Sequence, residues 1–361
     1  MKNLKLLFAF ALLTAIASTD VLAQTHKWRV NNTPDNKYIR KPDGTGICDH
    51  CFNSLATAVA SPAVSANDTL YVEATPYSYG NAITPTKPVT IIGVGYYLLP
   101  TQNPDLQQST EKSIVQSFII NPEASGTVLE GLYVSAGGSG IHNIIVDASD
   151  ITIKRCSFEA ITFSNNVTRS NVTITQNVGG DINQDNTANV GISNLIITNN
   201  YLASATLRQG HVGNFTNNII RNYVNGYSGM NYRDNIFADG DFIANDNNTN
   251  NTRNNTFGVT NWLMTLPGNT NEVEAPTSVF TTYPITFDGH FTTKPDCATC
   301  GHGYPWPAPG GTLKGVFGGT TPYVKAGIPN VPSIYKLTTT AQVATGSQTP
   351  VTISTRSNNN N

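Results

Sequence analysis

The sequence predicts an all-β fold, a right-handed parallel β-helix in which successive coils of the chain stack on one another. Three observations lead to this prediction: a repeat of roughly twenty residues, one apolar strand in each repeat, and a polar corner residue at a fixed place in it. The corner positions lie 21, 23, 18, 17 and 20 residues apart and are occupied by Cys156, Asn177, Asn200, Asn218, Asn235 and Asn255. Self-similarity at a fixed period is the signature of a solenoid, whose coils bury a shared core by stacking.

Two apolar columns define the predicted core. Three residues before the corners stand Ile153, Ile174, Ile197, Phe215, Tyr232 and Thr252, and two residues after them stand Phe158, Gly179, Leu202, Ile220, Phe237 and Phe257. The columns between them are mostly polar, which is the period of two of a half-buried strand. We therefore expect the columns through Ile153 and Phe158 to point inward, with at least five stacked coils between residues 150 and 257.

The asparagine column is predicted to form the corners. An asparagine amide can hydrogen-bond to the same group one coil away. Asparagine also tolerates the left-handed backbone conformation that a sharp corner requires.

Composition favours the same fold and excludes one class of partner. Only 12% of the residues are charged, below the usual quarter of a globular chain, and the formal net charge is −2. Nucleic-acid binding needs clustered lysine and arginine, so no nucleic-acid partner is expected.

Residues 1–23 read as a secretory signal peptide. Lys2 and Lys5 precede an apolar run from Leu6 to Ala17, and Ala23 ends a small-residue cleavage site. The sequence thus predicts an exported protein, secreted or at the cell surface, whose mature chain begins at Gln24. No later segment is long and apolar enough for a membrane span.

The remaining chain divides into three predicted regions. Residues 24–51 form an N-terminal extension, and residues 52–266 form the β-helix. The β-helix opens with a capping helix, because apolar residues fall at helical spacing at Phe52, Leu55, Ala56 and Val59. The first strands follow at 70–72, 89–92, 128–134 and 144–146.

Residues 267–361 form an irregular C-terminal region. The repeat is lost beyond Pro267, and residues 295–332 are rich in proline and glycine. Alternation around Ile334 and Leu337, and again at Val351 and Ile353, predicts a terminal strand pair.

Several segments carry a resemblance to a known family. The stretch FNSLATAVASPAVSANDTLYVEA resembles the start of pectin-lyase-like β-helix proteins, in which a capping helix runs into a strand through a Gly-Asp-Thr turn. Here Asn67 replaces that glycine, whereas Asp68 and Thr69 match. The runs PVTIIGVGYYL, ITNNYL, GVFGGTTPYVKAGIP and PSIYKL are similar to exported β-helix proteins of Bacteroidetes-type bacteria. The resemblance implies the fold and the compartment, but no activity.

Four cysteines form two CxxC motifs, Cys48–Cys51 and Cys297–Cys300, each with a histidine beside it (His50 and His302). Such pairs are typical of zinc sites in compact cytosolic domains. An exported chain meets an oxidising compartment, so we expect disulfides at all four cysteines and predict neither a metal site nor a cofactor. Cys156 replaces an asparagine in the corner column and is expected to be a buried, unreactive thiol.

A calcium-like fragment runs from Asp181 to Asn186 with alternating oxygen side chains. It lacks the glycine at its sixth position and the glutamate at its twelfth that an EF-hand loop needs. A solvated loop is therefore the preferred interpretation, with calcium binding left open.

Arginines are the candidate ligand-binding residues. Arg233 and Arg253 share one outward column with Lys154 and fall one coil apart, so we expect them about 5 Å from each other, where they can grip a carboxylate or sulfate. Arg208, His211 and Arg221 lie on nearby turns. Asp239, Asp241 and Asp246 are acidic candidates, and Tyr223 and Tyr227 are candidates for stacking on sugar rings, while Tyr232 belongs to the core.

These observations predict a non-catalytic binding or structural protein of the cell surface or extracellular matrix, with Arg233, Arg253, Arg208 and Arg221 contacting a polysaccharide. The alternative is a polysaccharide lyase acting on an acidic glycan, although no base converges with a carboxylate-neutralising group. A third hypothesis is ice or surface adhesion through the partial threonine column at Thr175, Thr198 and Thr216.

Overall fold

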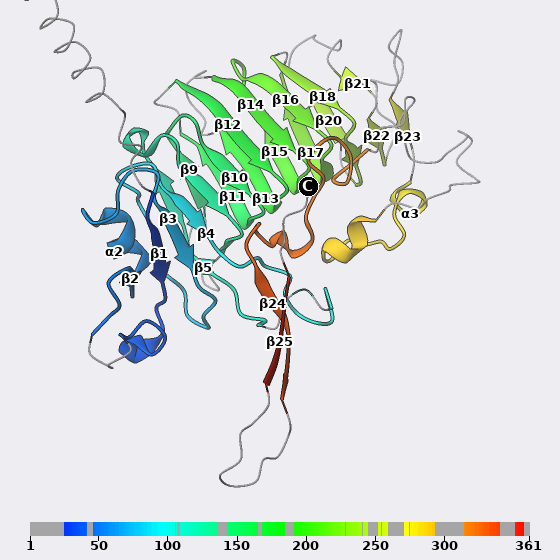
Figure 1. Ribbon diagram of the computed structural model, residues 1–361. Helices are drawn as coiled ribbons and strands as arrows, with labels where there is room; N and C mark the ends of the chain where they lie inside the picture. The colour runs from blue at the N-terminus through cyan, green and yellow to red at the C-terminus, as the bar shows by residue number, and fades with distance from the viewer. Residues whose placement is uncertain are drawn as a thin grey trace, which may run out of the picture.

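The computed structural model describes residues 25–41, 46–104, 106, 109–135, 143–164, 168–184, 191–227, 229–239, 241–244, 252–253, 255–258, 271–273, 275–292, 314–339 and 351–356. Within these residues the chain forms a parallel β-solenoid made of two long sheets (Figure 1). The predicted all-β, parallel β-helix fold is confirmed. Its right-handed winding stays a prediction, based on the strong preference of parallel crossovers for that hand. The signal peptide lies outside the described residues.

The first sheet has 11 strands, all paired in parallel. In spatial order they are β2 (Cys51–Phe52), β1 (Lys27–Val30), β3 (Thr69–Val72), β4 (Thr90–Ile92), β7 (Val128–Glu130), β10 (Thr152–Lys154), β12 (Arg169–Thr175), β14 (Ile192–Thr198), β16 (Val212–Thr216), β18 (Met230–Arg233) and β21 (Thr252–Arg253).

The second sheet has 12 strands, also paired in parallel. Its main path is β5 (Ile114–Val115), β8 (Tyr133–Val134), β11 (Ser157–Phe163), β13 (Val178–Gln184), β15 (Tyr201–Thr206), β17 (Ile219–Gly226), β19 (Ile236–Phe237), β22 (Thr256–Phe257) and β23 (Glu272–Val273). Alongside it pair β6 (Phe118–Ile120), β9 (Asn143–Val146) and β20 (Asp241–Ala244).

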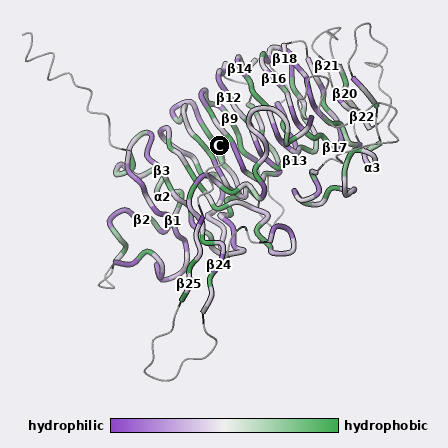
Figure 2. The backbone as a smooth tube through the Cα atoms, turned by 45° about the vertical axis from the view of Figure 1, so that its right-hand side comes forward, coloured by the Kyte–Doolittle hydropathy of each residue, from purple (hydrophilic) through white to green (hydrophobic). Residues whose placement is uncertain are grey.

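The inward columns are those that the repeat predicts. Ile153, Ile174, Ile197 and Phe215 are fully buried, and so are Leu202, Ile220, Phe237 and Phe257. Polar and apolar residues alternate along the strands, as Figure 2 shows. Register pairs connect these residues directly from coil to coil, for example Ile153 with Ile174 and Ile174 with Ile197. The side chains therefore stack into one continuous core, which is the main source of stability in a solenoid.

The corner asparagines form a hydrogen-bonded ladder inside the coil. Oδ1 of Asn200 accepts the backbone N–H of Asn177 at 3.0 Å and its side-chain N–H at 2.9 Å. The same pair of bonds recurs between Asn200 and Asn218, Asn218 and Asn235, and Asn235 and Asn255. The predicted hydrogen bond from coil to coil is thus confirmed.

The left-handed corner position differs from the prediction. It falls on the residue before the ladder, at Arg155, Gln176, Asn199, Asn217 and Asp234, with φ between 52° and 58°. The ladder asparagine has to point into the coil, where its Nδ2 also donates to a backbone carbonyl, such as that of Ile153 for Asn177. The sharp change of direction is therefore made one residue earlier.

The repeat also extends further than predicted at both ends. Asn271 continues the ladder, because its Oδ1 accepts the backbone N–H of Asn255 at 2.9 Å, and β23 pairs in register with β22. At the N-terminal end β1 lies in the expected extension yet pairs with β3 along its whole length. Trp28 and Val30 of β1 are buried while Lys27 and Arg29 are exposed, so β1 has the strand alternation that the repeat alignment did not reach.

The helices are short. α2 (Leu55–Ala60) begins at Ser54, whose hydroxyl accepts the N–H of Thr57, and it buries Leu55, Ala58 and Val59 in the main core. Ala56, predicted to face inward, is exposed. The other helices among the described residues are α3 (Pro276–Val279) and single 3₁₀ turns at Pro34–Asn36, Pro122–Ala124, Asp288–Phe291 and Lys325–Gly327.

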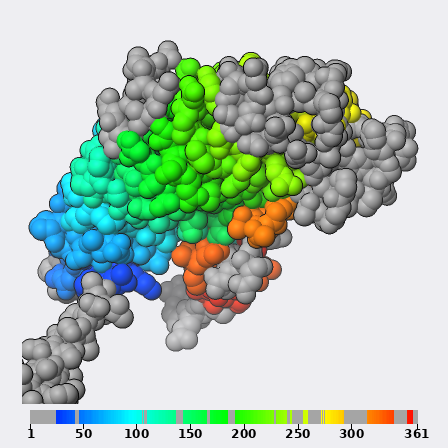
Figure 3. All heavy atoms as spheres, turned by 90° about the horizontal axis from the view of Figure 1, so that it is seen from above, coloured from blue at the N-terminus to red at the C-terminus, as the bar shows by residue number. Residues whose placement is uncertain are grey.

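The C-terminal region folds back over the solenoid. Residues 314–330, which we call the C-terminal strap, run against the left-handed corners, as the orange segment beside the green coils in Figure 3 shows. Asn199 donates to the carbonyls of Val316 and Gly318, and Gln176 donates to those of Thr321 and Pro322. The terminal strands β24 (Ser333–Thr339) and β25 (Val351–Arg356) form the predicted antiparallel pair, which projects from the stack (Figure 1).

Candidate functional site

Arg233 and Arg253 lie opposite each other on neighbouring strands. They are a register pair of β18 and β21, and the same outward column runs back through Thr216, Thr198, Thr175 and Lys154. Arg233 is exposed; the side chain of Arg253 is outside the described part of the structure. The backbone thus holds the two arginines one strand spacing apart, as the repeat predicts.

Lys154, at the other end of this column, is already paired. Its Nζ lies 2.9 Å from Oε2 of Glu130, and Arg155 lies 3.3 Å from the other oxygen of that carboxylate. A lysine held in such a pair is a poor candidate for the base of a lyase. The threonines between are linked by one 3.3 Å hydroxyl contact, from Thr216 to Thr198.

Arg221 belongs to a different surface, on the second sheet. Its positive charge acts on the hydroxyl of Tyr201, and the backbone of Tyr201 pairs with Ile219, two residues before Arg221. The backbone N–H of Asp239 in turn donates to the carbonyl of Arg221 at 3.2 Å. Burial raises the pKa of Tyr201, and the charge of Arg221 opposes this effect.

Tyr283 completes this group from the C-terminal region. Burial, together with the nearby carboxylate of Asp239, raises the pKa of Tyr283 to about 12. Both tyrosines interact electrostatically with both Arg221 and Asp239, so the four side chains lie close together. We call Tyr201, Arg221, Asp239 and Tyr283 the Tyr–Arg–Asp cluster.

The cluster is open to solvent. Arg221 and Asp239 are exposed, and the two tyrosines are half-buried. Tyr223 follows Arg221 on β17 with 40% of its surface exposed. The apolar sides of Tyr201 and Tyr283 rest on a second hydrophobic cluster between the outer face of the second sheet and residues of the C-terminal region such as Phe280 and Phe291. The rings are thereby held in fixed positions with their polar groups outward.

Arg208 and His211 lie in the turn between β15 and β16, apart from Arg221, Arg233 and Arg253. Arg208 is half-buried, and its carbonyl accepts the N–H of His211. His211 is buried, and its Nδ1 accepts the N–H of Ile192 at 3.1 Å. Burial, and then the charge of Arg169, lower the pKa of His211 to about 4. This histidine is therefore neutral and structural at neutral pH.

The calcium-like fragment is part of a strand where it is described. Asp181 to Gln184 belong to β13, so the expected solvated loop is wrong for these four residues. Asp181 accepts a hydrogen bond from Ser204 on the neighbouring strand. Asp185 and Asn186 lie outside the described residues, as do Asp246, Cys297, Cys300 and His302. In the described part of the chain no three histidine, cysteine or acidic side chains form a group suited to a metal ion.

Cys48 and Cys51 are joined in a disulfide. Cys156 is a buried free thiol, as expected, and burial raises its pKa to about 12. The prediction that all four CxxC cysteines are oxidised stays a prediction, since the second pair is not described.

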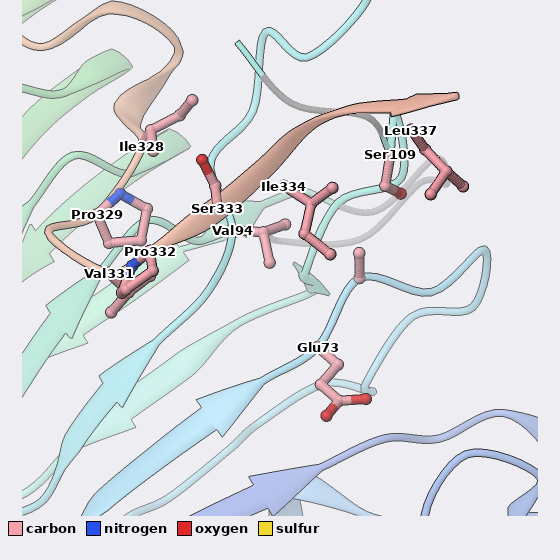
Figure 4. Close-up of a pocket in the computed structure, with 11 residues that line it drawn as sticks. Glu73, Val94, Ser109, Ile328, Pro329, Val331, Pro332, Ser333, Ile334 and Leu337 are labelled. Atoms are coloured by element: carbon pink, nitrogen blue, oxygen red, sulfur yellow. The ribbon is translucent and has the colours of Figure 1, made fainter. Parts of the chain in front are cut away.

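A cavity of about 650 Å³ lies between the terminal strand pair and the first coils (Figure 4). Val94, Ile328, Val331, Ile334 and Leu337 give it an apolar lining. Glu73, at its edge, is held by Arg29 and Asn31. The cavity therefore suits apolar groups better than a sugar.

Sequence reasoning missed Tyr201 and Tyr283. Tyr201 lies one residue after a ladder asparagine, in the column of Ser157, Val178, Ile219 and Ile236, which a search of outward columns for aromatic residues would have found. Tyr283 carried no such signal, because its place depends on how the C-terminal region folds back.

Comparison of the chain with protein-family models, with curated proteins and with solved structures returned no significant match. No helix among the described residues is long and apolar enough to cross a membrane. The function therefore has to be argued from the geometry.

Proposed function

We propose that this protein is an exported β-helix of the pectin-lyase-like type that binds polysaccharide at the cell surface or in the extracellular matrix without cleaving it. Export is proposed from the signal peptide of residues 1–23. The resemblance of the N-terminal segment and of the later runs supports the family and the compartment. The binding role rests on the Tyr–Arg–Asp cluster.

The chemistry of the cluster fits a sugar ligand. Aromatic rings offer flat apolar faces for stacking on pyranose rings, and Tyr223 adds a further exposed ring on the same strand as Arg221. A guanidinium and a carboxylate supply donors and acceptors for hydroxyl groups. Because the tyrosines are packed on the C-terminal region, little side-chain entropy is lost when a ligand binds.

Arg233 and Arg253 support a second contact, toward acidic groups of the same polymer. Their register pairing places two positive charges on neighbouring coils. A linear glycan lying along the solenoid can meet repeated groups on successive strands, which are spaced about 4.8 Å apart. The runner-up, a lyase acting on an acidic glycan, would use the same pair to neutralise a uronate carboxylate.

One binding experiment separates these possibilities. The mature protein and three variants would be titrated calorimetrically with neutral and uronate-containing oligosaccharides at two salt concentrations. The variants are Arg221→Ala/Tyr223→Ala, Arg233→Ala/Arg253→Ala and, as a control on a surface remote from both, Arg40→Ala. We expect the Arg221→Ala/Tyr223→Ala variant to bind about tenfold more weakly, a loss of roughly 1.4 kcal/mol in binding free energy.

The outcomes discriminate clearly. Loss only in the Arg233/Arg253 variant, with a flatter salt dependence, places recognition of an acidic glycan on the first sheet. Ultraviolet absorbance from unsaturated product, abolished by Arg233→Ala, would replace binding with the lyase reaction. Equal affinity in all variants, or no binding to any oligosaccharide, would refute the proposal. Ice or surface adhesion remains the third hypothesis and would appear as ice-growth inhibition.

A further inference from the structure

Two histidines that are far apart in sequence lie side by side at one edge of the first sheet. His26 directly precedes β1 and His50 directly precedes β2, and these strands pair in parallel. The two imidazole rings are nearly parallel, with 12° between their planes and 6.3 Å between their centroids. Both side chains are exposed, and Trp28 contacts both rings.

Asp68 fixes the position of His26. Its Oδ1 accepts the backbone N–H of His26 at 2.7 Å and lies 3.7 Å from Nδ1 of the ring. Its Oδ2 accepts the indole N–H of Trp28 and the backbone N–H of Ser65, each at 2.8 Å. Although burial acts in the opposite direction, these hydrogen bonds hold the pKa of Asp68 below its usual value.

This arrangement favours Nε2 of His26 as the ring nitrogen that can coordinate a metal ion. The negative charge of Asp68, 3.7 Å from Nδ1 and so beyond hydrogen-bond distance, favours electrostatically the tautomer that carries its proton on Nδ1 and its lone pair on Nε2. The same carboxylate–histidine pairing is found behind histidines that coordinate metal ions, where it orients the ring and raises its basicity. Asp68 itself is not a ligand, since both of its oxygens are occupied by N–H donors.

The disulfide holds His50 in place from the other side. His50 lies within the Cys48–Cys51 loop, where the N–H of Cys51 donates to the carbonyl of Cys48 at 3.1 Å. The carbonyl of His50 accepts the N–H of Arg29 on β1 at 2.9 Å. The backbone of each histidine is therefore anchored, and only rotation of the side chains is needed to bring two nitrogens to one point.

We propose that His26 and His50 together bind one divalent transition-metal ion of the class that prefers imidazole: copper, nickel or zinc. Two imidazoles coordinate such an ion at about 2.0–2.1 Å each. No third histidine, cysteine or acidic side chain in the described residues completes a larger group there. The ion would keep open positions for water or for a group on another molecule. The site is separate from the Tyr–Arg–Asp cluster and does not depend on the proposed glycan binding.

The test is a titration of the mature, disulfide-bonded protein, prepared without a polyhistidine tag, with copper, nickel and zinc chlorides. Calorimetry gives stoichiometry and affinity. Copper quenching of tryptophan fluorescence reports on the site through Trp28, one of the three tryptophans of the chain, whose ring lies 5.1 Å from that of His50. His26→Ala and His50→Ala are compared with His290→Ala, a histidine in the C-terminal region. His26 and His50 are exposed and His290 is half-buried, and circular dichroism verifies that each variant is folded.

We expect one equivalent of ion per chain in the wild-type protein and in His290→Ala. Each of the other two variants should bind at least about tenfold more weakly, because loss even of a group that only orients a ligand costs 10–100-fold. Copper quenching should fall in parallel. The proposal is overturned if none of the three ions binds, or if His26→Ala and His50→Ala bind as tightly as the wild type.

Discussion

Asn177 and Asn200 are 23 residues apart in the chain, yet a single oxygen of Asn200 accepts both the backbone and the side-chain N–H of Asn177. The side-chain N–H group of Asn200 also donates to the carbonyl of Ile174 and to Oδ1 of Asn218, so this one amide joins three coils. Because both residues are fully buried, water cannot replace these bonds. The ladder therefore fixes the register of the coils as well as their corners.

Asn200→Ala should destabilise the fold by about 2–4 kcal/mol, since it removes the acceptor of the buried backbone N–H of Asn177 and one donor to the carbonyl of Ile174. Chemical denaturation provides the measurement. Asn231→Ala is the matched control, because Asn231 makes its bond to Asn214 on an exposed face. It should change the free energy of unfolding by less than about 0.5 kcal/mol. Equal effects of the two substitutions would show that the ladder contributes little.

Gly327→Ala should loosen the C-terminal strap. Gly327 has φ of +59°, and a Cβ there would lie 2.1 Å from a ring carbon of Tyr96 and 2.5 Å from the carbonyl oxygen of Arg155. The expected cost is about 2–4 kcal/mol, from strain and overpacking together. Gly80→Ala, at φ of +97° with nothing within 4 Å of the new methyl, carries the backbone strain alone and should cost only about 1–2 kcal/mol. Thermal unfolding of the two variants compares them, and a Gly80 variant less stable than the Gly327 variant would contradict this reasoning.

Stability should fall as the pH drops from about 6.5 to about 4, in part through His211. Its pKa is lowered to about 4 in the folded chain, so in this window the unfolded state binds a proton that the folded state does not. Unfolding is then favoured by acid, by up to ~3 kcal/mol at the lower end. His211→Asn, whose Oδ1 can accept the N–H of Ile192, should remove this contribution. Denaturation midpoints across the window test it, with Asn231→Ala as a control that changes no titrating group. A slope as steep in His211→Asn as in wild type would rule His211 out as the source.

The native protein should show no thiol reactive toward a disulfide reagent, and the unfolded, unreduced protein should show one. The single thiol is Cys156, which is buried with a raised pKa. The other four cysteines are expected in disulfides, as Cys48 and Cys51 are. Thiol counting before and after denaturation makes the measurement. A count of three on unfolding would mean that Cys297 and Cys300 are reduced.

The sequence alone determined that the chain stacks parallel strands coil upon coil and which columns face inward. Ile153, Phe158 and the equivalent residues recur once in each coil. The alternation of apolar and polar residues is local and is shared by the coils, so it decides which columns are buried. For the same reason Arg233 and Arg253 could be placed on neighbouring strands. The terminal strand pair was readable from the alternation around Leu337 and Ile353.

The tertiary structure decided the contacts between segments that do not share the repeat of about twenty residues. Tyr201 meets Tyr283, and His26 meets His50 and Asp68, because of how the chain ends fold against the coils. The spacing of residues along the sequence does not predict these contacts, because they depend on packing between distant segments. The entropic cost of closing the loop between two such segments varies only slowly with the length of the loop. The tertiary structure also decided the position of the left-handed corner residues. The ladder asparagine must direct its amide into the core, so the residue before it takes the left-handed conformation.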